Sequence, residues 1–137
     1  MTQYNATPEV LIAMLRMAGE KLTIARRLLE AGFFGDAASR AYYAAFYAVS
    51  AALAERGMTY SSHKQTLGAF NGEFVKAAIF PPDSFRKLQR LFDDRQTGDY
   101  DWETQLERKD AERDLADAES LVNACGDYLK KQAGVSL

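Results

Sequence analysis

The segment between Asp36 and Leu53 constrains the fold most, because a helix of this sequence would be apolar on almost every side. Its apolar residues recur at three- and four-residue intervals and are mostly alanines. The aromatic residues among them are Tyr42, Tyr43, Phe46 and Tyr47. A helix without a broad polar face has to be covered on more than one side. Small residues let neighbouring backbones approach, and aromatic rings supply large contact areas. We therefore expect this helix at the centre of a helical bundle, where it also contacts a second copy of the chain.

Signals for helix ends predict five helices in all. The first begins at Thr7-Pro8, a cap followed by a proline at the first helical position, and ends near Gly32. The apolar helix begins with Asp36 as its cap and closes at Gly57, where we expect left-handed backbone. No segment alternates as a strand does, and the connections are short. Neighbouring helices should therefore pack antiparallel in an all-α, up-and-down bundle of the four-helix type.

The other three helices occupy the second half of the chain. One begins with Ser62 as its cap, and a pair of prolines stops it. The next runs on until Gly98, which we expect to interrupt it, and residues 99–102 read as a polar and aromatic loop. Thr104 and Glu107 have the spacing of a capping box for the long last helix.

Composition narrows the class of protein. The 137 residues, 47% hydrophobic and 26% charged, fit one globular domain over residues 1–137. A single cysteine, Cys125, and a single histidine, His63, exclude an internal disulfide framework and the usual cysteine or histidine zinc sites. Cys125 has an apolar helical register and should be a buried, inert thiol. No apolar run could span a membrane and no signal peptide is evident, so we expect a cytoplasmic protein without metal or cofactor.

Charge is unevenly distributed along the chain. Between Asp93 and Glu119 there are eleven acidic and four basic residues, a local charge of −7, whereas the rest has thirteen basic and eight acidic residues. Such asymmetry can steer a basic protein to one face and a phosphate group to another. The simpler interpretation, which we favour, is that the acidic stretch is an ordinary solvated helix face.

Arg40 is the first candidate site residue, because it lies in the most apolar helix, close to Tyr43. An arginine buried there would need an anionic partner. That partner is either a carboxylate of the chain, such as Asp99 or Asp101, or the phosphate or carboxylate of a ligand.

A second candidate cluster spans residues 93–102, where Arg95 and Tyr100 are surrounded by acidic residues. If the cluster is a site, Arg95 would bind a phosphate or carboxylate, and Asp99 and Asp101 would orient the arginines. The alternative is a capped helix end with ordinary solvated charge.

His63 is the third candidate. It lies in the first turn of a predicted helix, where the helix dipole disfavours its protonated form. A neutral imidazole beside Lys64 could bind a phosphate or shuttle a proton. Alternatively the ring packs on Tyr60 and has no chemical role.

Three blocks of sequence, taken together, resemble small prokaryotic HEPN-domain proteins. They are the DAASRAYYAAFY run at residues 36–47, Ser-His-Lys at 62–64 before a phenylalanine-rich helix, and R-x-x-x-D-Y-D at 95–101. The resemblance extends from about Val10 to Tyr128. It implies an all-α bundle that dimerises around its central helices, and a partnership with a small nucleotidyltransferase.

The resemblance also bears on catalysis. Many HEPN proteins are metal-independent RNases whose Arg-x(4–6)-His motif cleaves RNA, with the histidine as acid and base. In this chain Arg95 has the arginine position, and Tyr100 or Asp101 has the histidine position. A tyrosine, with a reference pKa near 10, is a poor base at neutral pH. In toxin–antitoxin members, the nucleotidyltransferase is thought to transfer AMP to a tyrosine beside this motif, and Tyr100 is its nearest counterpart.

The sequence thus favours a HEPN-like dimer that acts as an interaction module, or as a nucleotide- or RNA-binding module, of a toxin–antitoxin-type system. Two alternatives stay open. One is an active RNase toxin that uses Arg95 with Tyr100 or His63, and the other is a bundle that only dimerises.

Overall fold

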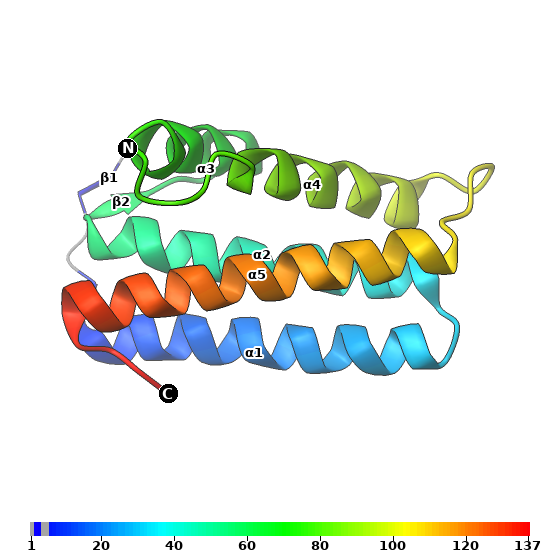
Figure 1. The fold of residues 1–137 in the computed structure, drawn as a ribbon, viewed down its shortest axis with the longest axis horizontal. Coiled ribbons are helices and arrows are strands. Elements are labelled where there is room, and N and C mark those ends of the chain that lie inside the picture. Colours follow the sequence, from blue (N-terminus) through cyan, green and yellow to red (C-terminus); the bar gives the residue numbers. More distant parts are fainter. Residues whose placement is uncertain (1, 4–5) are drawn as a thin grey trace.

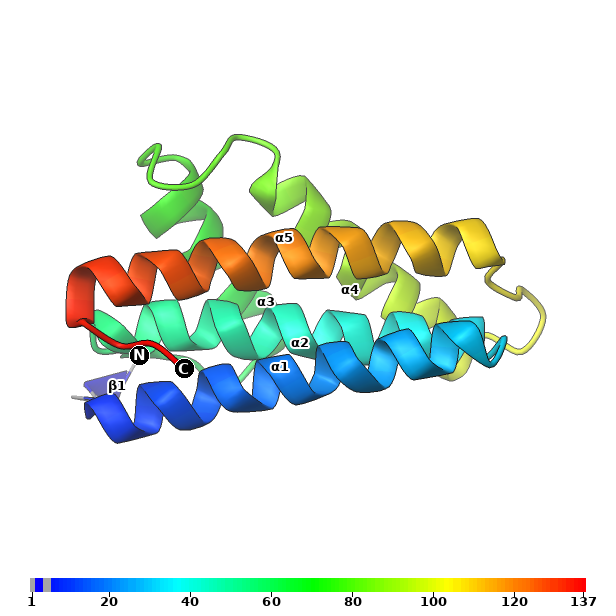
Figure 2. The same ribbon diagram turned by 60° about the horizontal axis from the view of Figure 1, so that its bottom comes forward.

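The computed structural model describes residues 2–3 and 6–137 and has an all-α fold. Its long helices are α1 (Pro8–Glu30), α2 (Phe34–Glu55), α4 (Ser84–Tyr100) and α5 (Arg108–Ala133). Between α2 and α4 lie α3 (His63–Phe70) and the π-helical turn η1 (Asn71–Val75). Two short strands, β1 (Thr2–Gln3) and β2 (Met58–Thr59), pair antiparallel. Successive long helices run in opposite directions (Figure 1). Helices α1, α2 and α5 lie side by side, and α4 packs on the side of α2 that faces away from α1 (Figure 2). The predicted up-and-down bundle is confirmed.

The central helix is α2, as its apolar sequence predicts. It packs against α1, α4 and α5, and almost all of its alanines are buried. Tyr42, Val49 and Leu53 are at most 1% exposed. Removing each of these side chains from water contributes roughly 2 kcal/mol. Cys125 on α5 is buried in the same core, as predicted, and burial raises the pKa of its thiol to about 12.

Local hydrogen bonds explain where several helices begin. Thr7 caps α1 by accepting a hydrogen bond from the backbone N–H of Val10 at 3.3 Å. Ser62 caps α3 by accepting one from the backbone N–H of Gln65 at 3.0 Å. Gly57 follows α2 with a φ of 76°, the left-handed backbone expected of a glycine at a helix end. These predicted helix ends are confirmed.

Two predicted helix starts are wrong. Helix α2 begins at Phe34, so Asp36 lies in its first turn and favours the helix through the dipole instead of capping it. Helix α5 begins after Glu107, whose backbone N–H donates to the carboxylate of Asp110 at 2.9 Å. Thr104 lies in the preceding loop. At α5 the reciprocal contact of Glu107 and Asp110 caps the first turn, whereas at α2 no side chain of the N-cap residue Phe33 does so.

The predicted interruption at Gly98 is also wrong, because α4 continues to Tyr100. At Gly98 the backbone of α4 lies directly against the backbone of Gly35 at the start of α2. A Cβ atom on Gly98 would lie 2.6 Å from the carbonyl oxygen of Gly35. Glycine is therefore required here for close approach, not for a turn.

We expect Gly98→Ala to destabilise the fold by about 2 kcal/mol, although alanine is the better helix former, because overpacking against a backbone atom forces the two helices apart. Gly19→Ala is the matched control, since Gly19 lies in α1 and an added Cβ would meet open space there. This control should be stabilised by up to about 1 kcal/mol. Urea unfolding measures both, and a Gly98→Ala protein as stable as the Gly19→Ala protein would contradict the close contact.

Helices α4 and α5 meet through a buried group of charged side chains. Asp114 is fully buried, and neither of its oxygens has a nitrogen or hydroxyl partner. Burial, together with a hydrogen bond to Asp94 and the negative charge of that residue, raises the pKa of Asp114 to about 9, while Arg113 and Arg90 act in the opposite direction. Arg90 in turn pairs with Asp117. Asp114 therefore stays protonated at neutral pH.

This raised pKa makes stability depend on pH. In the unfolded chain Asp114 ionises near its ordinary value of 3.8, so unfolding at neutral pH releases a proton. The free energy of unfolding should fall as the pH rises from about 5 to about 8. Asp114→Asn keeps a neutral hydrogen-bonding side chain and should reduce that fall by about 4 kcal/mol. Asp127→Asn, at an exposed position of α5, is the control. Denaturant unfolding at both pH values checks the effect, and an unchanged pH dependence in Asp114→Asn would exclude it.

None of the described helices is apolar over a stretch long enough to cross a membrane.

Candidate functional site

Arg95 is the centre of the candidate site and faces α2. Its Nη2 donates a hydrogen bond to the hydroxyl of Tyr43 at 2.6 Å. Its Nε lies 3.1 Å from Oδ2 of Asp99, an ion pair without hydrogen-bond alignment. Only 14% of the Arg95 side chain is exposed. A carboxylate of the same helix therefore balances the charge of Arg95 within the protein.

Three tyrosine rings surround the guanidinium group of Arg95. The ring centres of Tyr43, Tyr100 and Tyr42 lie 5.3, 5.6 and 5.9 Å from its central carbon. Such contacts stabilise a cation by about 0.5–1 kcal/mol each. Tyr42 is fully buried, whereas Tyr100 is 70% exposed. The tyrosine in the histidine position of the motif therefore has an accessible hydroxyl.

Of the two aspartates expected to orient arginines, only Asp99 contacts one. Asp99 also accepts a hydrogen bond from Ser39 of α2 at 3.3 Å, which ties the end of α4 to α2. Asp101 is exposed and accepts hydrogen bonds from the backbone N–H groups of Glu103 and Thr104, both at 3.0 Å. These hydrogen bonds lower the pKa of Asp101. Asp101 therefore shapes the loop instead of orienting Arg95.

The expectation that Arg40 is buried in an ion pair is wrong. Arg40 is exposed, and none of the described carboxylates lies within ion-pair distance of it. The physical reason is that α1 and α4 leave this side of α2 open. Arg40 lines the resulting surface pocket of about 480 Å³ together with Tyr43 and Asp99. Arg40 thus lines this pocket together with the two residues that hold Arg95, whereas Arg95 itself is not part of the lining.

His63 is held in a fixed position at the start of α3. Its Nδ1 lies 2.6 Å from the hydroxyl of Tyr42, and its ring stacks on Phe46 at 4.3 Å between centres. Partial burial lowers the pKa of His63, and the charge of Arg95 lowers it further. The imidazole is therefore neutral at pH 7. Lys64, the next residue, is exposed to solvent.

The structure brings His63 and Arg95 to one aromatic cluster although they lie far apart in the sequence. The ring of His63 lies 5.6 Å from that of Tyr42 and 6.1 Å from that of Tyr43. Arg95 contacts the same two rings. Tyr42 was not among the residues expected to act in the site. Its position one helical turn before Phe46 was the available signal, because residues at this spacing share a helix face.

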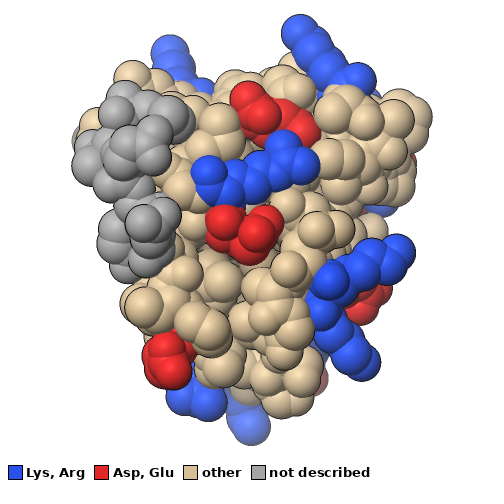
Figure 3. Space-filling model, turned by 90° about the vertical axis from the view of Figure 1, so that its left-hand side faces the viewer, with Lys and Arg blue, Asp and Glu red and all other residues tan. Residues whose placement is uncertain are grey.

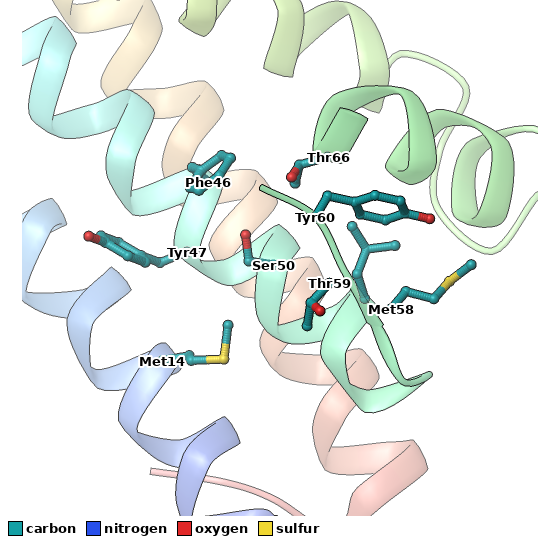
Figure 4. A pocket seen from close by; sticks show the side chains of 9 residues that line it. Met14, Phe46, Tyr47, Ser50, Met58, Thr59, Tyr60 and Thr66 are labelled. Carbon is teal, nitrogen blue, oxygen red and sulfur yellow. The ribbon is translucent and has the colours of Figure 1, made fainter. Parts of the chain in front are cut away.

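An apolar pocket of about 280 Å³ lies on the other side of Phe46. Figure 4 shows side chains from α1, α2, α3 and the β2 segment around it, among them Met14, Tyr47 and Met58. Its lining has hydroxyl groups but no charged side chain. Among the described side chains, no group of three or more histidine, cysteine, aspartate or glutamate residues could hold a metal ion. The charged groups of the candidate site are therefore Arg95 and the residues around it, and not the lining of this pocket.

The chain is similar to a known domain family and to several known proteins. Residues 12–129 match the HEPN domain family. The "UPF0332 protein" of Thermotoga maritima is 34% identical over 120 residues, which cover 88% of this chain and 91% of that protein. "Putative toxin MJ0142" of Methanocaldococcus jannaschii is 28% identical over 116 residues, or 85% of this chain and 79% of that protein.

A solved structure supports the fold. The crystal structure of TT1696 from Thermus thermophilus superimposes with a TM-score of 0.75 at 20% sequence identity, covering 87% of this chain and 98% of that one. The family match covers most of the chain, and the Thermotoga relative aligns along nearly its whole length. This chain therefore belongs to the HEPN family.

Proposed function

We propose that this protein is the HEPN component of a toxin–antitoxin-type pair, a homodimer that binds a nucleotidyltransferase partner and its nucleotide and does not itself cleave RNA. The proposal rests on the contacts of Arg95 and on the residue that follows it in the motif. Its guanidinium group is held by Tyr43 and Asp99, and the motif position that follows it is a tyrosine.

Cleavage of a phosphodiester needs a free cation for the developing charge and a base that works near neutral pH. Asp99 already balances the charge of Arg95 from 3.1 Å. A phenol holds its proton at neutral pH, so the tyrosine in the histidine position is a poor base. Both features favour a protein that binds its partner and nucleotide over one that cleaves RNA.

Two further observations support the partner and the dimer. The Methanocaldococcus relative bears the name "Putative toxin MJ0142", which fits a two-component system. On α2, the aromatic residues Tyr43, Phe46 and Tyr47 are only partly covered by the rest of the chain. Aromatic side chains that remain partly exposed on a central helix are suited to contact a second subunit.

The position of Tyr100 is suited to one reaction with the partner, the transfer of AMP to its hydroxyl. Its hydroxyl is accessible on a side chain that is 70% exposed, and Arg95 lies beside its ring. In the reaction, the Tyr100 oxygen attacks the α-phosphorus of ATP, pyrophosphate leaves, and the phenol proton passes to solvent. The product is an AMP ester of Tyr100, whose new negative charge Arg95 would stabilise.

We expect the purified protein, incubated with ATP and the nucleotidyltransferase encoded beside it, to gain the mass of AMP on a peptide containing Tyr100. Tyr100→Phe should abolish the gain even though the other six of the seven tyrosines remain. Intact and peptide mass spectrometry measure both. AMP on another residue, or RNA cleavage by the wild-type protein alone, would contradict the proposal.

An RNase activity is the second candidate function, and the position of His63 favours it. His63 is neutral, its Nδ1 is held by Tyr42, and it shares the aromatic cluster with Arg95. A neutral imidazole near a guanidinium group is the pair that acid–base cleavage of RNA requires. In this candidate, His63 replaces the histidine that is absent from the motif.

If His63 acts as the base, wild-type protein should cleave single-stranded RNA, and His63→Ala should lower the rate about 100-fold or more. Because the pKa of His63 is lowered, the rate should stay constant around pH 7 and fall only in more acidic buffer. Ser120→Ala, at an exposed uncharged position of α5 away from His63, is the control and should leave the rate unchanged. Failure of the wild-type protein to cleave RNA excludes this candidate.

A further inference from the structure

The loop between α4 and α5 exposes two aromatic side chains at one end of the bundle. Trp102 is 92% exposed and Tyr100 is 70% exposed. The loop projects beyond the helices on the side opposite to the chain ends (Figure 1). Burying such a tryptophan on association releases a large apolar area, and tryptophan and tyrosine dominate the energetics of protein interfaces. The loop therefore has the side chains of a contact surface.

The loop is preformed. Asp101 accepts hydrogen bonds from the backbone N–H groups of Glu103 and Thr104, so that one carboxylate closes a turn around Trp102. The hydrogen bond from the Asp101 N–H to the carbonyl of Thr97 joins this turn to the end of α4. A loop that is ordered before binding loses little conformational entropy when a partner docks.

The charge around Trp102 selects the kind of partner. Residues 99–107 contain four acidic residues and no basic one. Asp99 pairs with Arg95 and Glu107 pairs with Lys109. Asp101 and Glu103, on either side of Trp102, have no basic partner among the described side chains. The unpaired carboxylates beside Trp102 repel the many phosphate groups of a nucleic acid, so this part of the loop is suited to a cationic partner.

The surface beside Trp102 has room for long side chains. Trp102 lines two hollows of about 360 Å³ each, one on the side of Gly35 and Gln105 and one on the side of Tyr100 and Gln96. Asp101 borders both hollows. A cationic side chain in either hollow would have an aromatic face and a carboxylate together, which is the arrangement that binds guanidinium groups best.

The same end of the molecule already contains one such contact. The guanidinium group of Arg108 lies over the ring of Phe34 at 4.9 Å. The end of the bundle with the chain ends is different, since acidic and basic side chains alternate there without forming a patch of one sign (Figure 3). We propose that the loop of residues 99–107 is a docking surface for an arginine-rich segment of a partner protein, with Trp102 as the anchor between Asp101 and Glu103.

Trp102 is the sole tryptophan of the chain, so its fluorescence reports on this loop directly. A short synthetic peptide of alternating arginine and alanine should change the emission of Trp102 saturably, and added salt should weaken the binding. The same peptide with glutamate in place of arginine, and an oligouridylate of equal length, should leave the emission unchanged. An equal response to the oligouridylate, or no response to the arginine peptide at millimolar concentration, would overturn the proposal.

Calorimetry on variants shows whether the arginine peptide binds at this loop or is attracted only by the acidic charge of the whole protein. Trp102→Ala should weaken the arginine peptide about tenfold and Glu103→Gln about threefold. Glu9→Gln removes one exposed acidic charge at the opposite end of the bundle and should have no effect. Because Trp102 and Glu103 are exposed, both loop variants should keep the wild-type thermal unfolding curve. Affinity within about twofold of wild type for Trp102→Ala would overturn the proposal, whatever the outcome for AMP transfer or RNA cleavage.

Discussion

The backbone contact between Gly35 and Gly98 determines where the other residues of the site can lie. Two helices that touch through glycines approach more closely than side chains would allow. Asp99 follows Gly98 directly, and Arg95 lies almost one turn before it, whereas Ser39 and Tyr43 lie one and two turns after Gly35. The hydrogen bonds from Arg95 to Tyr43 and from Ser39 to Asp99 are therefore consequences of one close approach.

That approach also limits what Arg95 can do. A guanidinium group that is only 14% exposed needs a counter-charge, and Asp99 supplies it from the next turn of the same helix. Tyrosine rings on three sides add weaker attraction and keep water away. A free phosphate would have to compete with Asp99 for the guanidinium group of Arg95. The cluster is therefore better suited to stabilise a charge placed on Tyr100 than to attract a free anion.

The sequence predicts the fold well, because periodic apolar residues and helix caps are local signals. Gly98 was misread because its role depends on Gly35, and no pattern within α4 records a contact with a residue so distant in the chain. Arg40 was misplaced for a related reason. The alanine-rich sequence of α2 predicts burial, but whether each face is covered depends on how α1 and α4 are spaced. The contact of His63 with Tyr42 likewise forms only when α3 packs on α2.

Helix α4 is fixed on two sides by different chemistry. Toward α2 it is held by a charged pair and tyrosines around Arg95, and toward α5 by the ion pair of Asp94 with Arg113 beside the buried Asp114. Asp94 and Arg95 are adjacent in sequence, so a change on either side moves the same turn of the helix. The loop that exposes Trp102 continues from this turn and is tied to it through Thr97. Ionisation of the buried Asp114 at alkaline pH would therefore loosen α4 on α5 and, with it, the order of the loop that a partner would contact.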